Sequence, residues 1–169
     1  EEAAGFVVID DCVTTLSERL RDAYLRANPS EDVSSQRYAE YLVAFVQSCM
    51  TDVPDIVSHS MTVYWAHPAE TLFWGAGDSG DLAVLTAALL EESGFDSGIA
   101  IIHGMTFAVV SMERYTSADA PSGYHVVRVD RDGGYYYLID AIADVPIGYV
   151  PEGYGYSDSS FAYYGSDVS

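Results

Sequence analysis

Apolar side chains recur every three or four positions in two stretches near the start of the chain, the spacing of an amphipathic helix. Residues 28–32 (Asn-Pro-Ser-Glu-Asp) lie between the two stretches and predict a turn, with Ser34 or Ser35 as the N-cap of the second helix. The pattern therefore predicts a helical hairpin over residues 12–50. The apolar positions are Val13, Leu16, Leu20 and Tyr24 in the first stretch and Tyr38, Tyr41, Leu42 and Phe45 in the second.

Two further helices are predicted before the middle of the chain. Pro68 suits the first turn of a short helix that runs to Phe73, and residues 75–77 (Gly-Ala-Gly) end it. A longer helix follows, with Asp78 as its expected N-cap and Gly94 just after its end. We expect one face of this helix to be apolar, formed by Leu82, Leu85, Ala88 and Leu89.

The pattern changes to β-strands after Gly94. Strands are predicted over residues 99–102, 107–112, 124–129 and 135–140, and residues 130–134 (Asp-Arg-Asp-Gly-Gly) predict a hairpin turn. Helices followed by an antiparallel sheet indicate the α+β class. We expect one domain over residues 1–150, with a helical part at 12–94 and a sheet part at 97–150. The tail 151–169, rich in Tyr, Gly and Ser, is either a linker or a segment lying over the sheet.

The charge is strongly unbalanced. The 169 residues include 26 acidic and seven basic ones, all seven of them arginine, so the net charge is −19. Such a surface repels phosphate backbones, and we expect no nucleic-acid partner. It fits either an ordinary acidic protein or a halophilic one, in which salt screens the self-repulsion. No apolar run approaches the roughly 20 residues of a membrane span.

Two cysteines lie at similar distances from the turn of the predicted helical hairpin. Cys12 precedes the turn and Cys49 follows it, so an antiparallel hairpin would make them neighbours. This placement favours a disulfide, and hence an extracellular or cell-surface location. The alternative is two unpaired buried cysteines.

One short motif indicates a possible chemical function of this chain. Residues 68–72 (Pro-Ala-Glu-Thr-Leu) are followed by residues 77–82 (Gly-Asp-Ser-Gly-Asp-Leu) at the start of the longer helix. This segment resembles the transglutaminase-like superfamily, which has a papain-like cysteine peptidase fold. The likeness is to its prokaryotic and archaeal branch, with the signature Pro-x-Glu-Thr-Leu…Gly-Asp-Cys-x-Asp. It covers about residues 34–150 and implies helices packed on a sheet, with the nucleophile at the start of the central helix.

The resemblance implies a Cys-His-Asp triad, and this chain departs from it at the nucleophile. Ser79 stands where the family has cysteine. A helix N-terminus stabilises an anion by up to ~2 kcal/mol, which helps a thiol but is too little to ionise a hydroxyl. Ser79 would therefore need a well-placed base. The alternative is that Ser79 only caps backbone donors of the helix.

The other two triad positions are also altered or open. Aligned on Gly104, the family histidine position holds Met105, which cannot transfer a proton. His103 lies two residues earlier and could serve only with a strand bulge, since it would be displaced by ~6.6 Å. Asp140 matches the carboxylate at the end of a strand, or is a solvated turn residue. His125 could approach Asp140 across the hairpin.

Further residues of the motif region are candidates for supporting roles. We expect Glu70, Trp74, Asp78, Asp81 and Met105 to form a binding site around Ser79. Glu70 would brace the loop of the nucleophile, and Trp74 would line a cleft or pack in the core. We expect no cofactor and no metal site. Asp130 and Asp132 could suggest calcium, but the later ligand positions of such a loop are missing.

These observations predict a pseudoenzyme with a degenerate triad, an extracytoplasmic module that binds a peptide or a surface protein. The alternative is a peptidase-like or acyl-transfer enzyme, seen as a Cys-to-Ser variant or using Ser79 with a displaced histidine. A third possibility is a structural module whose tail makes contacts through Tyr154, Tyr156, Tyr163 and Tyr164.

Overall fold

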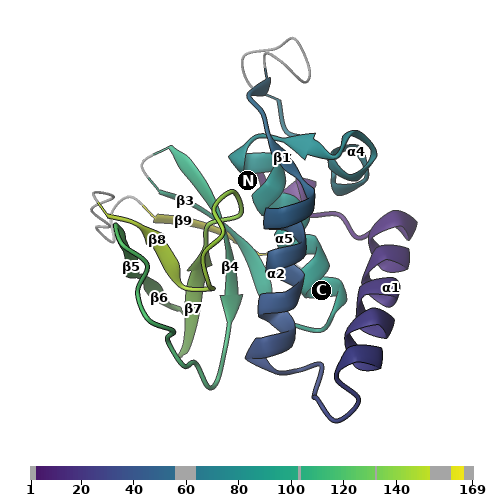
Figure 1. Ribbon diagram of the computed structural model, residues 1–169. Helices are drawn as coiled ribbons and strands as arrows, with labels where there is room; N and C mark the ends of the chain where they lie inside the picture. The colour runs from purple at the N-terminus through teal and green to yellow at the C-terminus, as the bar shows by residue number, and fades with distance from the viewer. Residues whose placement is uncertain (1–2, 56–63, 103, 132, 153–160, 166–169) are drawn as a thin grey trace.

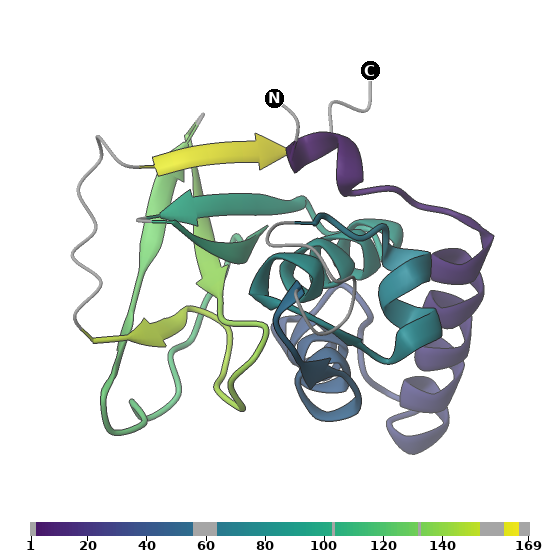
Figure 2. The same cartoon turned by 90° about the horizontal axis from the view of Figure 1, so that it is seen from above.

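Helices pack against one face of an antiparallel sheet in the computed structural model, which describes residues 3–55, 64–102, 104–131, 133–152 and 161–165. Figure 1 shows the helices on one side and the strands on the other, and Figure 2 shows the two layers from above. The α+β class predicted from the sequence is confirmed.

The predicted helical hairpin is present. A short 3-10 helix, η1 (Ala3–Phe6), precedes α1 (Asp11–Ala27) and α2 (Gln36–Cys49). Asp10 caps α1 by accepting hydrogen bonds from the backbone N–H groups of Cys12 and Val13, and Ser35 caps α2 by accepting one from Tyr38. Local capping chemistry thus sets the start of both helices.

The central helix α5 (Ser79–Glu92) separates α1 from α2. Both outer helices pack against α5 and have little contact with each other (Figure 1). Every residue of α5 from Gly80 to Leu90 is buried. The predicted single apolar face was therefore too narrow, because a helix covered on all sides is apolar all round.

The strands form one main sheet, which has five strands among the described residues, in the order β6-β7-β4-β3-β9 and antiparallel throughout. Its central strands β3 and β4 are joined by a tight turn at Gly104. The bounds are β3 (Ser97–Ile102), β4 (Met105–Ser111), β6 (Arg128–Arg131), β7 (Gly134–Ile139) and β9 (Phe161–Gly165).

The strand predicted over residues 124–129 is two strands with different partners. β5 (Tyr124–Val126) pairs with β8 (Tyr149–Pro151), whereas β6 pairs with β7. The chain changes partner at Val127, whose N–H donates to Gly148 and whose carbonyl accepts from Leu138. The hairpin between β6 and β7 is confirmed, with Gly133 at a φ of 83°; Asp132 lies outside the described residues.

The C-terminal segment is part of the domain. β9 pairs antiparallel with β3, from Ile102↔Phe161 to Gly98↔Gly165, and forms an edge of the main sheet (Figure 2). The predicted boundary at residue 150 is therefore wrong, and the sheet includes the segment that carries Tyr163 and Tyr164. Tyr154 and Tyr156 lie outside the described residues.

The two faces of the main sheet bury different sets of side chains. Alternate residues of the strands face α5, among them Ile99, Ala108 and Ile139. The intervening residues form a second apolar cluster on the opposite face, which includes Phe107 and Leu138. This alternation decides which side chains of β4 can approach the start of α5.

Within the described parts of the chain, no helix combines the length and the apolar character that crossing a membrane requires.

Candidate functional site

The site is built around the turn that begins α5. Asp78 is the N-cap, and its Oδ1 accepts hydrogen bonds from the backbone N–H groups of Gly80 at 2.8 Å and Asp81 at 3.0 Å. Ser79 is the first residue of the helix and is half-buried. Asp78 thus provides the predicted cap, and the alternative role of Ser79 as the cap is excluded.

Asp81 connects the helix to the preceding segment. Its Oδ1 accepts from the N–H of Ala66 at 2.8 Å, and its Oδ2 accepts from the N–H of Asp78 at 3.3 Å. The side chain is fully buried. Burial is the main cause that raises the pKa of Asp81 to about 6, and the neighbouring carboxylates of Asp78 and Asp55 raise it further.

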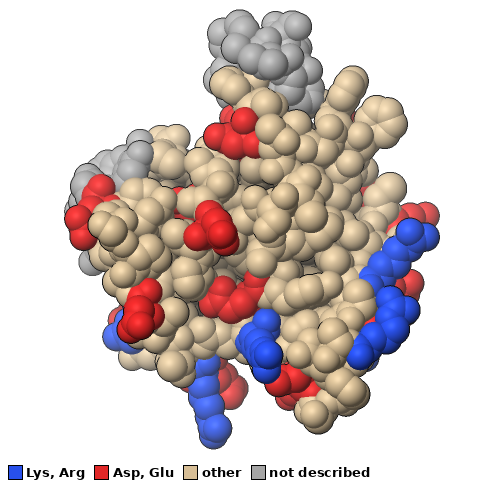
Figure 3. Space-filling view, viewed as in Figure 1, with Lys and Arg blue, Asp and Glu red and all other residues tan. Residues whose placement is uncertain are grey.

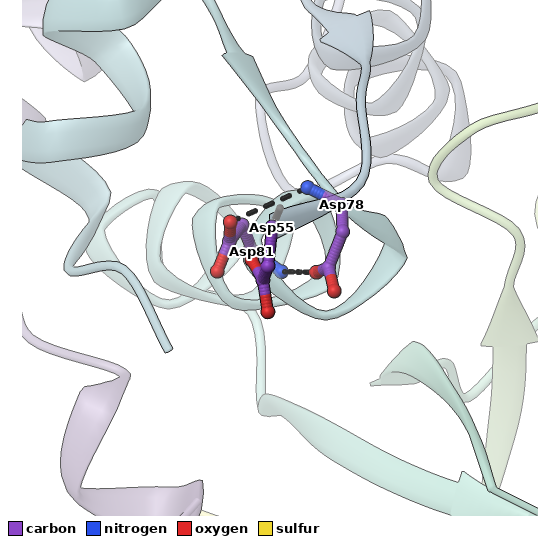
Figure 4. A group of neighbouring side chains, drawn as sticks. All are labelled: Asp55, Asp78 and Asp81. Carbon is purple, nitrogen blue, oxygen red and sulfur yellow. Dashed lines mark hydrogen bonds between the residues drawn. The ribbon is translucent and has the colours of Figure 1, made fainter. Parts of the chain in front are cut away.

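A third carboxylate lies beside these two. Asp55 is buried, and its Oδ2 accepts from the N–H of Tyr64 at 2.5 Å. Figure 4 shows Asp55 between Asp78 and Asp81, and one oxygen of each lies within 4.8 Å of the others. These three residues are the described ones whose geometry could hold a cation, since carboxylate oxygens are ligands for hard cations. Each of them also has an oxygen bonded to a backbone N–H.

The glycine of the motif has a steric role. A Cβ on Gly77 would lie 2.6 Å from the Cβ of Asp81, a distance that side chains do not tolerate. The strands β1 (Thr51–Asp52) and β2 (Ala76–Gly77) run parallel here, and Asp52 pairs with Gly77. Gly77 therefore allows this segment to pass directly over the buried carboxylate.

Glu70 holds the segment that precedes α4. It belongs to α4 (Pro68–Trp74), and its carboxylate accepts from the Tyr64 hydroxyl at 3.0 Å and from the N–H of His67 at 2.8 Å. These bonds fix the segment whose Ala66 N–H reaches Asp81. Glu70 acts on the start of α5 through this segment.

Asp140 lies on the same side of the molecule, directly after β7. It is buried, and its Oδ1 accepts from the N–H groups of Ile142 and Ala143. Its pKa is raised by burial and, to a smaller extent, by Asp52, which also raises the pKa of Asp78. Asp52 thus lies near enough to both carboxylates to raise the pKa of each. The alternative of a solvated turn residue is wrong, because Asp140 is buried and its carboxylate accepts backbone hydrogen bonds within the turn.

The position assigned to the family histidine faces away from this site. Met105 packs against the cluster of Phe107 and Leu138, on the sheet face opposite to α5. On β4 the alternation places Thr106 on the α5 side, with Ala108 and Val110. A β4 side chain on the α5 face at this level would therefore be that of Thr106 rather than Met105. His103 lies outside the described residues.

His125 is not paired with Asp140 in the sheet. It lies on β5, and its partner across the pair is Val150 of β8 rather than a residue of β7. The expected approach across the β6–β7 hairpin is wrong, because the chain changes partner at Val127.

The predicted disulfide is also wrong. Cys12 and Cys49 are free and exposed. Cys12 lies in the first turn of α1 and Cys49 is the last residue of α2, at the end of the hairpin away from its turn, where the two helices lie apart (Figure 1). Similar distances from a turn bring two residues together only if the helices stay in contact along their length.

The two tryptophans have different environments. Trp65 is half-buried and stacks on Phe6, with ring centroids 6.1 Å apart. Trp74 is 63% exposed at the end of α4. Core packing is therefore excluded for Trp74.

Sequence reasoning did not single out Asp52, Asp55 or Thr106. The two aspartates lie in a segment with little periodicity, and acidic residues are frequent throughout this chain. Thr106 could have been found only by assigning the face of each β4 residue from its apolar neighbours.

Comparison of the chain with models of known protein families gives no match, and comparison with curated proteins gives none either.

Proposed function

We propose that this chain is a non-catalytic binding domain of transglutaminase-like type, whose ligand binds at the start of α5. The observation that carries the proposal is Ser79, a hydroxyl at the helix N-terminus where the resembling family has a thiol. A hydroxyl needs a general base to become a nucleophile. Among the described residues, no histidine lies on the sheet face that α5 covers.

The charge around the helix start favours a basic ligand. Asp55 and Asp81 lie beside Asp78, the residue before Ser79, and Asp52 acts on both Asp78 and Asp140 and is exposed to solvent. Carboxylates of one sign attract ligands of the opposite sign and favour their association. The ligand we propose is therefore a peptide segment of a protein that carries arginine or lysine.

An extracellular location was inferred from the disulfide, and the free cysteines remove that support. The proposed binding role does not depend on the location.

Peptide binding and hydrolysis test this function together. We expect a fluorescein-labelled peptide with alternating Arg and Gly to bind, and the same peptide with Glu in place of Arg not to bind. Asp52→Asn should weaken binding about tenfold, because this exposed carboxylate faces the proposed ligand. Asp119→Asn, an exposed aspartate in a distant loop, is the matched control. Equal binding of the two peptides would contradict the basic ligand.

Hydrolysis of an activated ester tests the enzymatic alternative. We expect the unaltered chain and Ser79→Ala to be equally inactive. Turnover that is lost in Ser79→Ala would show that the domain is an enzyme.

A restored triad tests the resemblance itself. Ser79→Cys combined with Thr106→His should give more hydrolysis than the two single changes add up to, since triad members act as a unit. Ser79→Cys combined with Met105→His is the matched control and should gain nothing, because Met105 faces the opposite side of the sheet.

A further inference from the structure

The largest exposed apolar side chains lie on α4, away from the carboxylates. Phe73 is 81% exposed and Trp74 is 63% exposed, the highest values among the large apolar residues that the structure describes. Their rings pack edge to face with centroids 5.4 Å apart. Exposed aromatic side chains of this kind are frequent anchors of protein interfaces.

An apolar groove lies between α4 and α1, and Leu72, the residue before this pair, borders it. Leu72 lines it from α4, and five residues of α1 line it from the other side, giving a volume of about 460 Å³. The α1 residues span two helical turns, or about 12 Å. This length matches a short amphipathic helix that uses anchors about three or four residues apart. The α1 residues are Asp11, Cys12, Thr15, Leu16 and Arg19.

The charges identify the kind of occupant. A net charge of −19 opposes a second copy of this chain and an anionic membrane surface. The groove itself has Asp11 at one end and Arg19 at the other. An occupant with a basic group over Asp11 and an acidic group over Arg19 complements both ends. A helix favours acidic residues at its own N-terminus and basic ones at its C-terminus, so it would run antiparallel to α1.

We propose that the groove between α1 and α4 docks an amphipathic helix of a partner protein, antiparallel to α1, with Phe73 and Trp74 as anchors at its edge. This surface is separate from the carboxylates at the start of α5, and the proposal does not depend on the function proposed for them.

The two free cysteines allow a direct test on the full chain. Cys12 lines the groove and Cys49 does not, although both are exposed. The probe is a synthetic helix of about 14 residues, with leucines along one face, Glu at its N-terminal end and Arg at its C-terminal end. At saturation it should slow alkylation of Cys12 about tenfold and leave Cys49 unchanged. A second probe with Glu and Arg exchanged should bind about tenfold more weakly.

Variants locate the contact. Trp74→Ala should weaken the first probe about tenfold, and Tyr135→Ala, an exposed aromatic on β7, is the matched control and should have no effect. The double change Asp11→Arg and Arg19→Glu should reverse the preference between the two probes. Since these side chains line the surface, circular dichroism should show an unchanged fold.

Three results would overturn the proposal. The first is equal alkylation of Cys12 with and without the probe. The second is self-association of the chain that protects Cys12 without any probe, which would identify a second copy as the occupant. The third is a Trp74-dependent fluorescence change with anionic vesicles and none with the probe, which would identify a membrane surface.

Discussion

The free backbone groups at the two ends of α5 are stabilised in different ways. At the N-terminal end, Asp78 and Asp81 accept backbone hydrogen bonds and an acidic residue lies where the helix dipole favours it. At the C-terminal end no basic residue lies in the last turn, and Glu91 and Glu92 oppose the dipole. Side chains of the helix itself thus specify its start, whereas its end depends on what packs around it.

Hydroxyl groups lie around the C-terminal end of α5. Ser93 lies 3.0 Å from Ser17 of α1, oxygen to oxygen. The hydroxyl of buried Tyr38 lies near Ser93 but makes no hydrogen bond within the described part of the chain. A cavity of about 190 Å³ is lined by these three residues among others. The contrast predicts large effects of substitution at the start of α5 and small ones at its end.

The largest expected effect is a pH dependence that comes from Asp81. Its pKa is about 6 in the folded protein and 3.8 in an unfolded chain, so the folded state binds the proton more tightly. This contribution to stability is full below pH 3.8 and is lost as the pH rises through 6, by about 3 kcal/mol in total. The free energy of unfolding in urea, measured from about pH 4 to about pH 8, should therefore fall as the pH rises.

Asp81→Asn should flatten this pH profile, since the amide does not titrate. Asp119→Asn is the control and should keep the slope. An unchanged slope in Asp81→Asn would assign the effect to Asp140, Asp78 and Glu40, whose pKa values are also raised by burial.

Gly77→Ala should destabilise the protein by about 1–3 kcal/mol, because the new methyl group overlaps the Asp81 side chain. Gly134→Ala is the matched control, since its Cβ would meet its nearest neighbours at an ordinary 3.7 Å. We expect that change to shift stability by less than about 0.5 kcal/mol. Equal melting temperatures of the two variants would mean that β2 can move away from α5.

Asp78→Ala should cost about 1 kcal/mol, because two backbone N–H groups lose their acceptor. Ser79→Ala changes the adjacent residue, which does not cap the helix, and should change the free energy of unfolding far less. A larger loss from Ser79→Ala than from Asp78→Ala would contradict the assignment of the cap.

The smallest effect is expected at the other end of α5. Tyr38→Phe removes a buried hydroxyl without a described partner and should leave stability within about 0.5 kcal/mol or raise it. Tyr115→Phe removes a hydroxyl that donates to the carbonyl of Ile147 at 2.7 Å, and should cost about 1 kcal/mol. A loss of more than about 0.5 kcal/mol in Tyr38→Phe would show that the Tyr38 hydroxyl has a hydrogen-bond partner in the cavity.

Local chemistry of the sequence determined the helix starts and the hairpins. Ser35 and Asp78 cap their helices with bonds that span two or three residues, and Gly133 permits the turn that joins β6 to β7. Such features depend on neighbours in the chain and can be predicted without the fold. The same holds for the position of Ser79 at the first turn of α5.

Tertiary structure decided which of these residues meet. Similar distances from a turn suggested that Cys12 and Cys49 are neighbours, yet α5 separates the two helices that carry them. A shift of one residue along β4 exchanges Met105 for Thr106 on the face toward α5, because successive side chains of a strand point to opposite sides. Sequence spacing fixes distances along an element, whereas the packing of the elements fixes which side chains face each other.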